Sequence, residues 1–458
     1  MTTRDLIDST AGLIADFVDG LPDRHVGPQA SIDDLRDRLQ GPVPEDASDP
    51  DVVIAELAAA ADGGLMASAG PRFFGFVVGG SLPAAFAADL LVTGWDQNAF
   101  VTTASPASTV IEEVAGEWLL DLLGLPPACS FAFATGATMA NFTALAAARD
   151  HVLKNAGWDV EADGLQDAPK VHTVVGEERH ITVDASLKML GLGAARSAVA
   201  AADDQGSMTP EGLREALDGL SGPTIIVAQA GNVNGGAVDP LREICAIARE
   251  REAWVHVDGA FGLWVAASPK HKQLLDGYEL ADSWSTDAHK WLNVPYDCGI
   301  AITAHPEAHR AAMGISASYL AQQGGIREPV DHSPEASRRA RGVPVYAAIR
   351  SLGRSGVAEM VERCCRHATR FADALEGHDG IEVLNDVVMN QVVVRFDDDD
   401  GITNEVIRKV QEEGTLWLGG ATWRDRAVMR ISVSNWSTTV EDVDRSVDAI
   451  VRCYRSVR

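Results

Sequence analysis

Residues 284–299, WSTDAHKWLNVPYDCG, place Lys290 between a histidine and a tryptophan, after a polar run and before an apolar turn with a proline. A lysine in this setting is either a solvated surface group or an amine whose surroundings keep it neutral and reactive. The two interpretations predict different proteins, and residues elsewhere in the chain decide between them.

The composition is that of a soluble globular protein. Of the 458 residues, 46% are hydrophobic and 23% are charged. The net charge of −28 repels nucleic-acid phosphates and anionic membranes, so we expect neither as a partner. The apolar runs are shorter than the ~20 residues of a membrane span, and the N-terminus lacks a signal-peptide pattern, which favours a cytoplasmic location. The six cysteines form no CxxC pair, and no zinc-type cluster occurs, so we expect free thiols and no metal.

Strand and helix patterns alternate from about residue 110 onward. The runs SFAFA, KVHTVVG, PTIIVAQA and AWVHVDG are each followed by a segment of helical periodicity. This alternation predicts an α/β domain with a mostly parallel sheet flanked by helices. Ligands of such sheets bind beyond the carboxyl ends of the strands, so functional residues should directly follow strands.

The two ends of the chain have hydrophobic patterns that differ from the strand and helix alternation of the middle. Residues 1–65 carry amphipathic helical patterns, and residues 346–458 carry alternating, half-buried runs before a closing helix. We therefore predict an N-terminal helical segment, a large α/β domain over residues 66–345 and a small α+β domain at the C-terminus.

Three motifs at predicted strand ends have both a structural and a functional interpretation. Gly136 lies between a strand and a helix start, where backbone amides can bind an anion, although such a turn is often only a turn. Asp258 ends an apolar strand, where an acid needs a cation or a strong donor unless it caps the next turn. His180 follows another strand and could simply be a hydrogen-bonding group. Together with Lys290, these residues meet the needs of pyridoxal phosphate: an anion cradle, an acid for the ring nitrogen, a stacking ring and an amine for the aldehyde.

The same segments resemble the group II pyridoxal-phosphate-dependent amino acid decarboxylases, the fold-type I group that includes aromatic L-amino acid decarboxylase. The resemblance rests on FATGATMANFTALAAAR, RHITVDASLKMLGLG, WVHVDGAFG and STDAHKWLNVPYDCG, in this order, within residues 66–350. It implies a fold-type I enzyme with a seven-stranded type of sheet. The implied reaction converts an L-amino acid to an amine and carbon dioxide, with pyridoxal 5′-phosphate as the cofactor.

The resemblance also assigns roles residue by residue. Lys290 would be the Schiff-base lysine and Asp258 the partner of the ring nitrogen, with His180 stacked on one ring face and Ala260 near the other. The phosphate would be held by a turn and by two residues before the lysine: Gly136, Ala137, Thr138, Asp287 and His289. Three further residues receive roles from the resemblance, namely Asn232 near the ring oxygen and the pair Phe74 and Phe76 at the substrate entrance.

One segment departs from the family pattern. Well-known members carry a loop tyrosine that returns a proton to the α-carbon, whereas residues 321–342 contain no tyrosine and the register puts Pro329 at that place. His332 is the nearest replacement, either as a proton donor or as an ordinary loop histidine, and Tyr319 is a second candidate. Gly324 and Gly325 suggest a flexible lid.

That departure keeps alternative functions open. In the family, loss of the tyrosine goes with aldehyde formation, so an aldehyde synthase or an aminotransferase-like reaction is the alternative. A cofactor-binding protein without turnover fits less well, because it needs no acid at the ring nitrogen. The resemblance further implies a homodimer with shared active sites. Aromatic residues near the expected entrance favour an aromatic or bulky apolar amino acid as the substrate.

Overall fold

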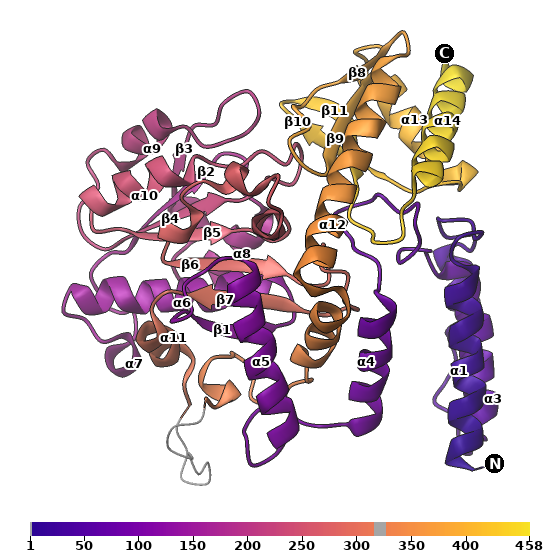
Figure 1. The fold of residues 1–458 in the computed structure, drawn as a ribbon, viewed down its shortest axis with the longest axis horizontal. Helices are drawn as coiled ribbons and strands as arrows, with labels where there is room; N and C mark the ends of the chain where they lie inside the picture. Colours follow the sequence, from indigo (N-terminus) through magenta and orange to yellow (C-terminus); the bar gives the residue numbers. More distant parts are fainter. Residues whose placement is uncertain (1, 316–326) are drawn as a thin grey trace. The chain divides into compact units, whose positions relative to one another are not determined.

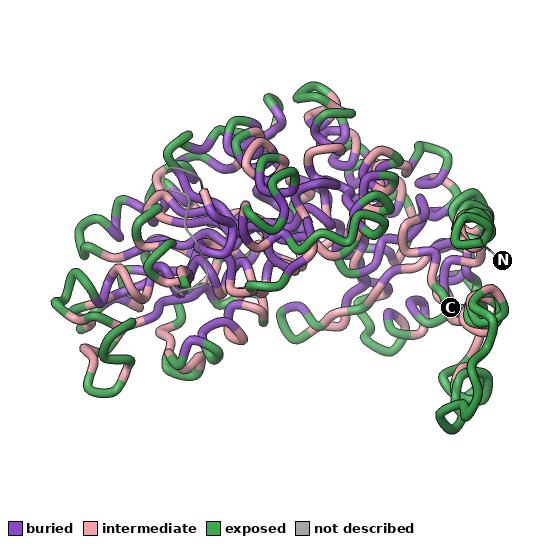
Figure 2. The backbone as a smooth tube through the Cα atoms, turned by 90° about the horizontal axis from the view of Figure 1, so that it is seen from below, coloured by how far each residue is buried: buried purple, intermediate pink, exposed green. Residues whose placement is uncertain are grey.

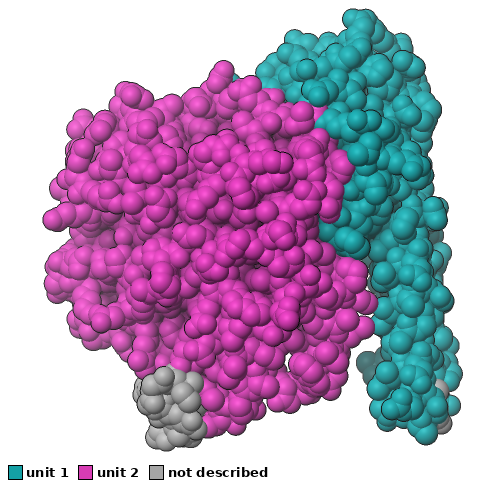
Figure 3. All heavy atoms as spheres, in the orientation of Figure 1, with its two compact units in different colours: residues 1–78, 370–384, 393–458 teal, residues 79–369, 385–392 magenta. Residues whose placement is uncertain are grey.

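A computed structural model describes residues 2–315 and 327–458 (Figure 1). The chain forms two compact units, drawn in different colours in Figure 3. The smaller unit joins the two ends of the chain, Met1–Val78, Arg370–Leu384 and Val393–Arg458, and the larger consists of Gly79–Thr369 and Asn385–Val392. The division at residues 65 and 345 remains a prediction.

The larger unit is built on a seven-stranded sheet of order β1-β7-β6-β5-β4-β2-β3 among the described residues. Its strands are β1 Ser130–Ala134, β2 His172–Gly176, β3 Ala198–Ala200, β4 Thr224–Gln229, β5 Trp254–Asp258, β6 Ser283–Asp287 and β7 Gly299–Thr303. Only β7 runs against its neighbours β1 and β6, while the other described pairs are parallel. The predicted mostly parallel α/β sheet is confirmed.

Helices cover this sheet, as Figure 1 shows. Every residue of β1, β4, β5, β6 and β7 is buried, as expected for strands covered on both faces. Figure 2 shows the buried segments of the chain in purple. The alanine-rich helix α6 packs against β5, β6 and β7 because its small side chains allow close approach. The helices are α4 Pro83–Trp95, α5 Pro106–Leu122, α6 Ala137–Asn155, α7 Val160–Asp163, α8 Ile181–Met189, α9 Pro210–Leu217, α10 Leu241–Glu250 and α11 Pro306–Met313.

Short 3-10 helices connect several of these elements. The segment after β5 that resembles a helix in the sequence, at residues 272–277, forms only the 3-10 helix η4. The 3-10 helices of the larger unit are η2 Ala194–Arg196, η3 Gly262–Ala267, η4 Lys272–Leu275, η5 Tyr278–Leu280 and η6 Pro329–Asp331. The long helix α12, Gly342–Glu376, is kinked at Gly353, where φ is 63°.

The smaller unit combines a four-stranded sheet of order β10-β11-β9-β8 with helices. Neighbours β10 and β11, and likewise β8 and β9, are antiparallel, so the predicted α+β texture of the C-terminal region is present. Its elements are α1 Thr3–Gly20, α2 Ile32–Leu39, α3 Pro50–Ala61, η1 Asp62–Gly64, β8 Ile381–Val383, β9 Gln391–Phe396, α13 Asp400–Glu413, β10 Gly419–Trp423, β11 Arg426–Ser432 and α14 Val440–Val457. Across residues 2–315 and 327–458, no helix combines the length and apolarity needed to cross a bilayer.

Candidate active site

The strand register brings the predicted strand-end residues to one edge of the large sheet. Gly299, at the start of β7, pairs with both Ala134 at the end of β1 and Asp287 at the end of β6. Asp258, at the end of β5, pairs with Ser285 of β6. The glycine turn after β1, Asp258 at the end of β5 and the lysine turn after β6 therefore form one row along this edge of the sheet.

The lysine turn begins directly after β6. The Lys290 Nζ lies 3.0 Å from the Asp287 Oδ2, and the His289 Nε2 lies 3.5 Å from the same oxygen. The Cys298 backbone N–H donates to His289 Nδ1 at 3.1 Å, and burial lowers the pKa of His289. The Asp287 side chain is 3% exposed, whereas that of Lys290 is 20% exposed. The lysine side chain is therefore partly exposed, while its carboxylate partner is enclosed.

A second segment holds the backbone of this turn. Gly79 lies so close that a Cβ there would overlap the Lys290 carbonyl oxygen. The Gly80 N–H donates to the Asn293 Oδ1 at 2.6 Å, and the Leu82 N–H donates to the Asn293 carbonyl at 2.8 Å. The lysine turn thus depends on a glycine that the sequence interpretation missed, and the pair GG at residues 79–80 was the available signal.

The glycine turn forms the start of α6. Gly136 is the N-cap residue, and within the described residues no side chain caps this helix. Its first amides are therefore available to an anion. A Cβ on Gly136 would lie 3.3 Å from His289 Cε1 and 3.6 Å from Asp287 Oδ1. The Thr138 carbonyl accepts a hydrogen bond from Ser186 at 3.1 Å, which ties α8 to this turn.

Asp258 is buried, and each of its carboxylate oxygens accepts one hydrogen bond. Its side chain accepts from the Asn141 Nδ2 at 3.2 Å and from the Ala260 N–H at 3.1 Å. The Ala260 carbonyl in turn accepts from the Asp287 N–H at 2.8 Å. One residue therefore links the acid to the lysine turn, and Asn141 is a further contact that the sequence interpretation did not name.

His180 lies beyond the end of β2 at the same edge. It is the N-cap of α8, where its Nδ1 accepts from the Thr182 N–H at 3.3 Å and contacts the Thr182 hydroxyl at 2.8 Å. These bonds leave the ring half-buried, with its orientation fixed from one side. The stacking role of His180 remains a prediction.

The side chain of Asn232 serves its own turn. Its Oδ1 accepts from the backbone N–H groups of Asn234 and Gly235 at 3.2 and 2.8 Å, and its Nδ2 donates to the Gln205 carbonyl at 3.1 Å. These bonds account for both ends of a buried amide. The structure gives Asn232 a role in holding its own turn, and its place near the ring oxygen of the cofactor stays a prediction.

The structure does not bring His332 to Lys290. The His309 Nε2 contacts the His332 carbonyl at 2.9 Å, and the His309 Nδ1 contacts Ser130 at 2.9 Å. Ser130 begins β1, a strand whose five residues span roughly 13 Å, and the glycine turn follows its other end. His332 therefore lies at the opposite edge of the sheet from Lys290 of its own chain, and its role as proton donor stays a prediction.

The histidines at this opposite edge predict acid destabilisation. Burial lowers the pKa of His309 and of His332 from 6.5 to about 3. Since the unfolded chain binds more protons between these values, stability is full above pH 6.5 and falls as the pH drops, by up to about 1.4 kcal/mol per unit for each histidine. We expect the thermal unfolding midpoint to fall between pH 7 and pH 5, and His309→Gln to weaken this dependence. A wild-type midpoint that stays constant over this range would contradict the prediction.

The remaining predicted residues lie elsewhere. Phe74 and Phe76 belong to the smaller unit, where Phe74 packs edge-on against Phe371 at 5.0 Å and the 63% exposed Phe76 stacks on Trp417 at 5.4 Å. Their role at a substrate entrance stays a prediction. Tyr319, Gly324 and Gly325 lie outside the described residues.

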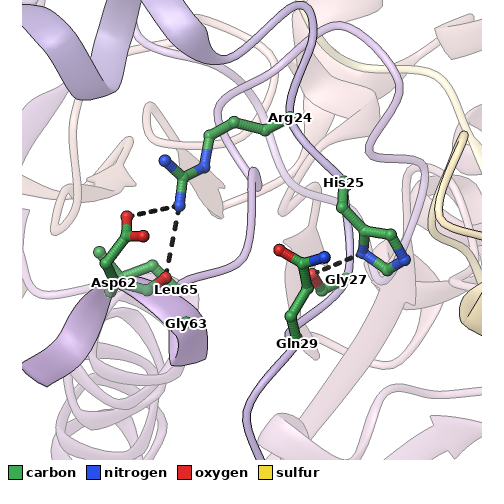
Figure 4. Close-up of a pocket in the computed structure, with 7 residues that line it drawn as sticks. All are labelled: Arg24, His25, Gly27, Gln29, Asp62, Gly63 and Leu65. Carbon is green, nitrogen blue, oxygen red and sulfur yellow. Dashed lines mark hydrogen bonds and ion pairs between the residues drawn. The ribbon is translucent and has the colours of Figure 1, made fainter.

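A small hollow in the smaller unit carries no comparable group of side chains (Figure 4). Its volume is about 180 Å³, and its polar groups bind one another. Arg24 donates to the Asp62 carboxylate at 2.7 Å, and the ring of His25 contacts the carbonyls of Gly27 and Glu412. These contacts hold the loop after α1 in place.

The residues at the sheet edge fit an anionic aldehyde with a basic ring nitrogen. The uncapped amides of α6 suit a phosphate, the partly exposed Lys290 suits an aldehyde, and the buried Asp258 suits a protonated ring nitrogen. Asp287 Oδ1 is also buried without a hydrogen-bond partner among the described residues, beside the place where the glycine turn opens.

Comparisons with known proteins agree with this fit. The pyridoxal-dependent decarboxylase conserved domain matches residues 33–397. The chain is 26% identical to 4-hydroxyphenylacetaldehyde synthase from Rhodiola rosea, over 96% of this chain and 93% of that protein. It is 25% identical to aromatic-L-amino-acid decarboxylase from Bacillus atrophaeus, over 94% and 91%. The crystal structure of Oryza sativa TDC with PLP and tryptamine superposes with a TM-score of 0.91 at 25% identity, over 99% of this chain and 97% of that one. The chain therefore belongs to the pyridoxal-dependent decarboxylase family and is a carboxy-lyase that uses pyridoxal 5′-phosphate.

Proposed function

We propose that the protein converts an L-amino acid with an aromatic or bulky apolar side chain to its amine and carbon dioxide. The observation that carries the proposal is the row of residues at one sheet edge, in which Lys290, Asp287, the Gly136 turn and Asp258 occupy neighbouring positions. The relatives named for aromatic amino acids support the substrate class, although L-2,4-diaminobutyrate decarboxylase of Rhizobium meliloti is also 27% identical over 81% of this chain and 76% of that protein.

When bound, the cofactor supplies an aldehyde that takes up the amino group and a ring that accepts the electron pair left by a bond broken at the α-carbon. The chain's own residues would do three things. The α6 amides would hold the phosphate, Asp258 would keep a proton on the ring nitrogen, and Asp287, 3.0 Å from Lys290 Nζ, would hold the proton of that amine. The enclosed carboxylates would act in a site with little water, where such interactions are strong.

The proton returned to the α-carbon decides the product. With His332 of the same chain at the opposite sheet edge, Tyr319 is the other sequence candidate for this step. We expect Tyr319→Phe to lower amine formation by about 10²-fold and to raise the share of aldehyde, because only the phenolic proton is lost. Product analysis checks this, and an unchanged ratio of amine to aldehyde would exclude Tyr319 as the donor.

An aldehyde synthase is the second candidate function. The absence of a tyrosine from residues 321–342 favours it, and so does the relative from Rhodiola rosea, which is named for an aldehyde product. A panel of aromatic, basic and acidic L-amino acids, assayed for carbon dioxide, amine, aldehyde and hydrogen peroxide, separates the two functions. Conversion of the cofactor to its amine form without carbon dioxide would contradict both.

We further propose that a second copy of the chain covers the N-terminal helices. Helices α1 and α3 contain no buried residue, and both expose apolar side chains, such as Ile7 at 60% and Leu57 at 54%. A homodimer would remove this apolar surface from water. We expect light scattering at micromolar concentration to give twice the mass of the 48.6 kDa chain, and a monomer would contradict the proposal.

A further inference from the structure

A connected row of buried polar side chains lies behind Asp258. Trp254, His256 and Asp258 alternate along β5, so their side chains lie on one face of the sheet. Asn141 of α6 and Ser283 of β6 join them through hydrogen bonds. None of the five side chains is more than 4% exposed, so water cannot replace these bonds.

The donors and acceptors of this row have only one possible arrangement, because the group at one end can only donate and the group at the other end can only accept. The Trp254 indole N–H can only donate, and it does so to Ser283 Oγ at 2.9 Å. At the other end, the carboxylate of Asp258 accepts from Asn141 Nδ2 at 3.2 Å, which turns Asn141 Oδ1 toward His256. His256 Nε2 must therefore carry the proton that it donates to this oxygen at 2.8 Å.

The other ring nitrogen then has to accept. His256 Nδ1 lies 2.9 Å from Ser283 Oγ, whose hydroxyl can donate to it while its oxygen accepts from the indole. Burial lowers the pKa of His256 to about 4, so the ring is neutral at neutral pH. Ser285 adds a second donor to the Asn141 oxygen at 2.5 Å. A neutral ring with one fixed tautomer thus orients the Asn141 amide.

We propose that Asn141 and His256 are positioning residues for Asp258, which orient its carboxylate toward the ring nitrogen of the cofactor. A donor on one oxygen from Asn141 and another from Ala260 leaves the carboxylate no room to rotate. The inference rests on the proposed function only in that it requires the cofactor to be bound. It adds that the charge of the ring nitrogen depends on residues that do not touch the cofactor.

The first test is Asn141→Leu, which has a similar volume but cannot donate. The full-length protein is stripped and reconstituted with pyridoxal phosphate labelled with 15N in the ring, and the nitrogen shift reports whether the ring carries a proton. We expect the signal to move toward the unprotonated position and the dissociation constant of the cofactor to rise about tenfold to a hundredfold. The matched control is Thr143→Val on the same helix, because the buried Thr143 hydroxyl bonds only the Met139 carbonyl among the described contacts.

A pair of variants at His256 keeps the test decisive if Asn141→Leu does not fold. Glutamine can place an N–H where His256 Nε2 lies, whereas phenylalanine cannot. We expect His256→Gln to keep the wild-type nitrogen shift and His256→Phe to lose it. Equal shifts in these two variants, or a wild-type shift in folded Asn141→Leu, would overturn the inference. If the wild type bound no pyridoxal phosphate, the proposed function and the inference would both fail. If it bound the cofactor and folded Asn141→Leu kept the wild-type shift, only the inference would fail.

Discussion

Replacing Lys290 with alanine is expected to lower amine formation by at least about 10³-fold, because in the proposed function this residue would be the attachment point of the cofactor. The amine lies 3.0 Å from Asp287 at the sheet edge, so its removal leaves that buried carboxylate without its cation. We expect the variant to bind pyridoxal phosphate without the imine absorbance band. Borohydride reduction followed by peptide mass spectrometry should label Lys290 in the wild type and no lysine in the variant.

The control for this experiment is Lys188→Ala, which removes an exposed lysine at the far end of α8. It should keep the wild-type activity and the label at Lys290. A borohydride adduct at any other lysine, or an imine band that persists in Lys290→Ala, would contradict the assignment. Such a result would also remove the main support for the proposed function.

The elements of the site that follow parallel strands could be predicted from the sequence. Gly136 and Asp258 end runs of apolar residues that are too short for helices, and parallel strands place such ends at a common edge. Strand order alone therefore predicts the row from the glycine turn to Asp258, without knowledge of side-chain contacts. Lys290 follows β6, which lacks a clear apolar pattern because Ser283, Ser285 and Asp287 are polar. Only the sequence motif around Lys290 indicated this residue.

The separation of His332 from Lys290 within one chain has a topological cause. A helix normally separates parallel strands, but β7 returns directly and runs antiparallel to β6, so it starts at the edge with Lys290 and ends at the opposite edge. The chain after β7 therefore starts from the edge opposite to the active site, where α11 and its His309 lie. The sequence gives no direction for a five-residue strand, so proximity along the chain to Lys290 does not predict proximity in space.

The residues behind Asp258 were missed although a signal was present. Strict alternation in WVHVD places His256 on the same face as Asp258, and a buried histidine two residues before a buried acid indicates a shared hydrogen-bond network. Asn141 could not be found in this way, because it belongs to another element. An asparagine in an alanine-rich helix is equally compatible with the solvated face.

Replacing Asp258 with asparagine is expected to lower the rate of decarboxylation by about 10³-fold while the cofactor still forms its imine with Lys290. The substitution preserves the size of the side chain but removes the negative charge that would hold the proton on the ring nitrogen. Without that proton the ring accepts electrons poorly, so the loss should appear in kcat rather than in KM. Stopped-flow absorbance and the steady-state constants check this expectation.

The same substitution also reverses the hydrogen bonds behind it. The oxygen of an asparagine amide at position 258 can still accept from the Ala260 N–H. Its NH2 group then faces the NH2 group of Asn141, so two donors meet. The Asn141 amide must therefore flip. His256 would then have to accept at Nε2, its tautomer would change, and the Ser283 hydroxyl would lose its acceptor. The control is Asp239→Asn, another buried carboxylate of this unit, which accepts two backbone N–H groups at 2.7 Å and lies outside the site. If both variants lowered kcat equally, the loss would reflect general destabilisation by a buried amide, whereas a loss confined to position 258 would tie it to the ring nitrogen.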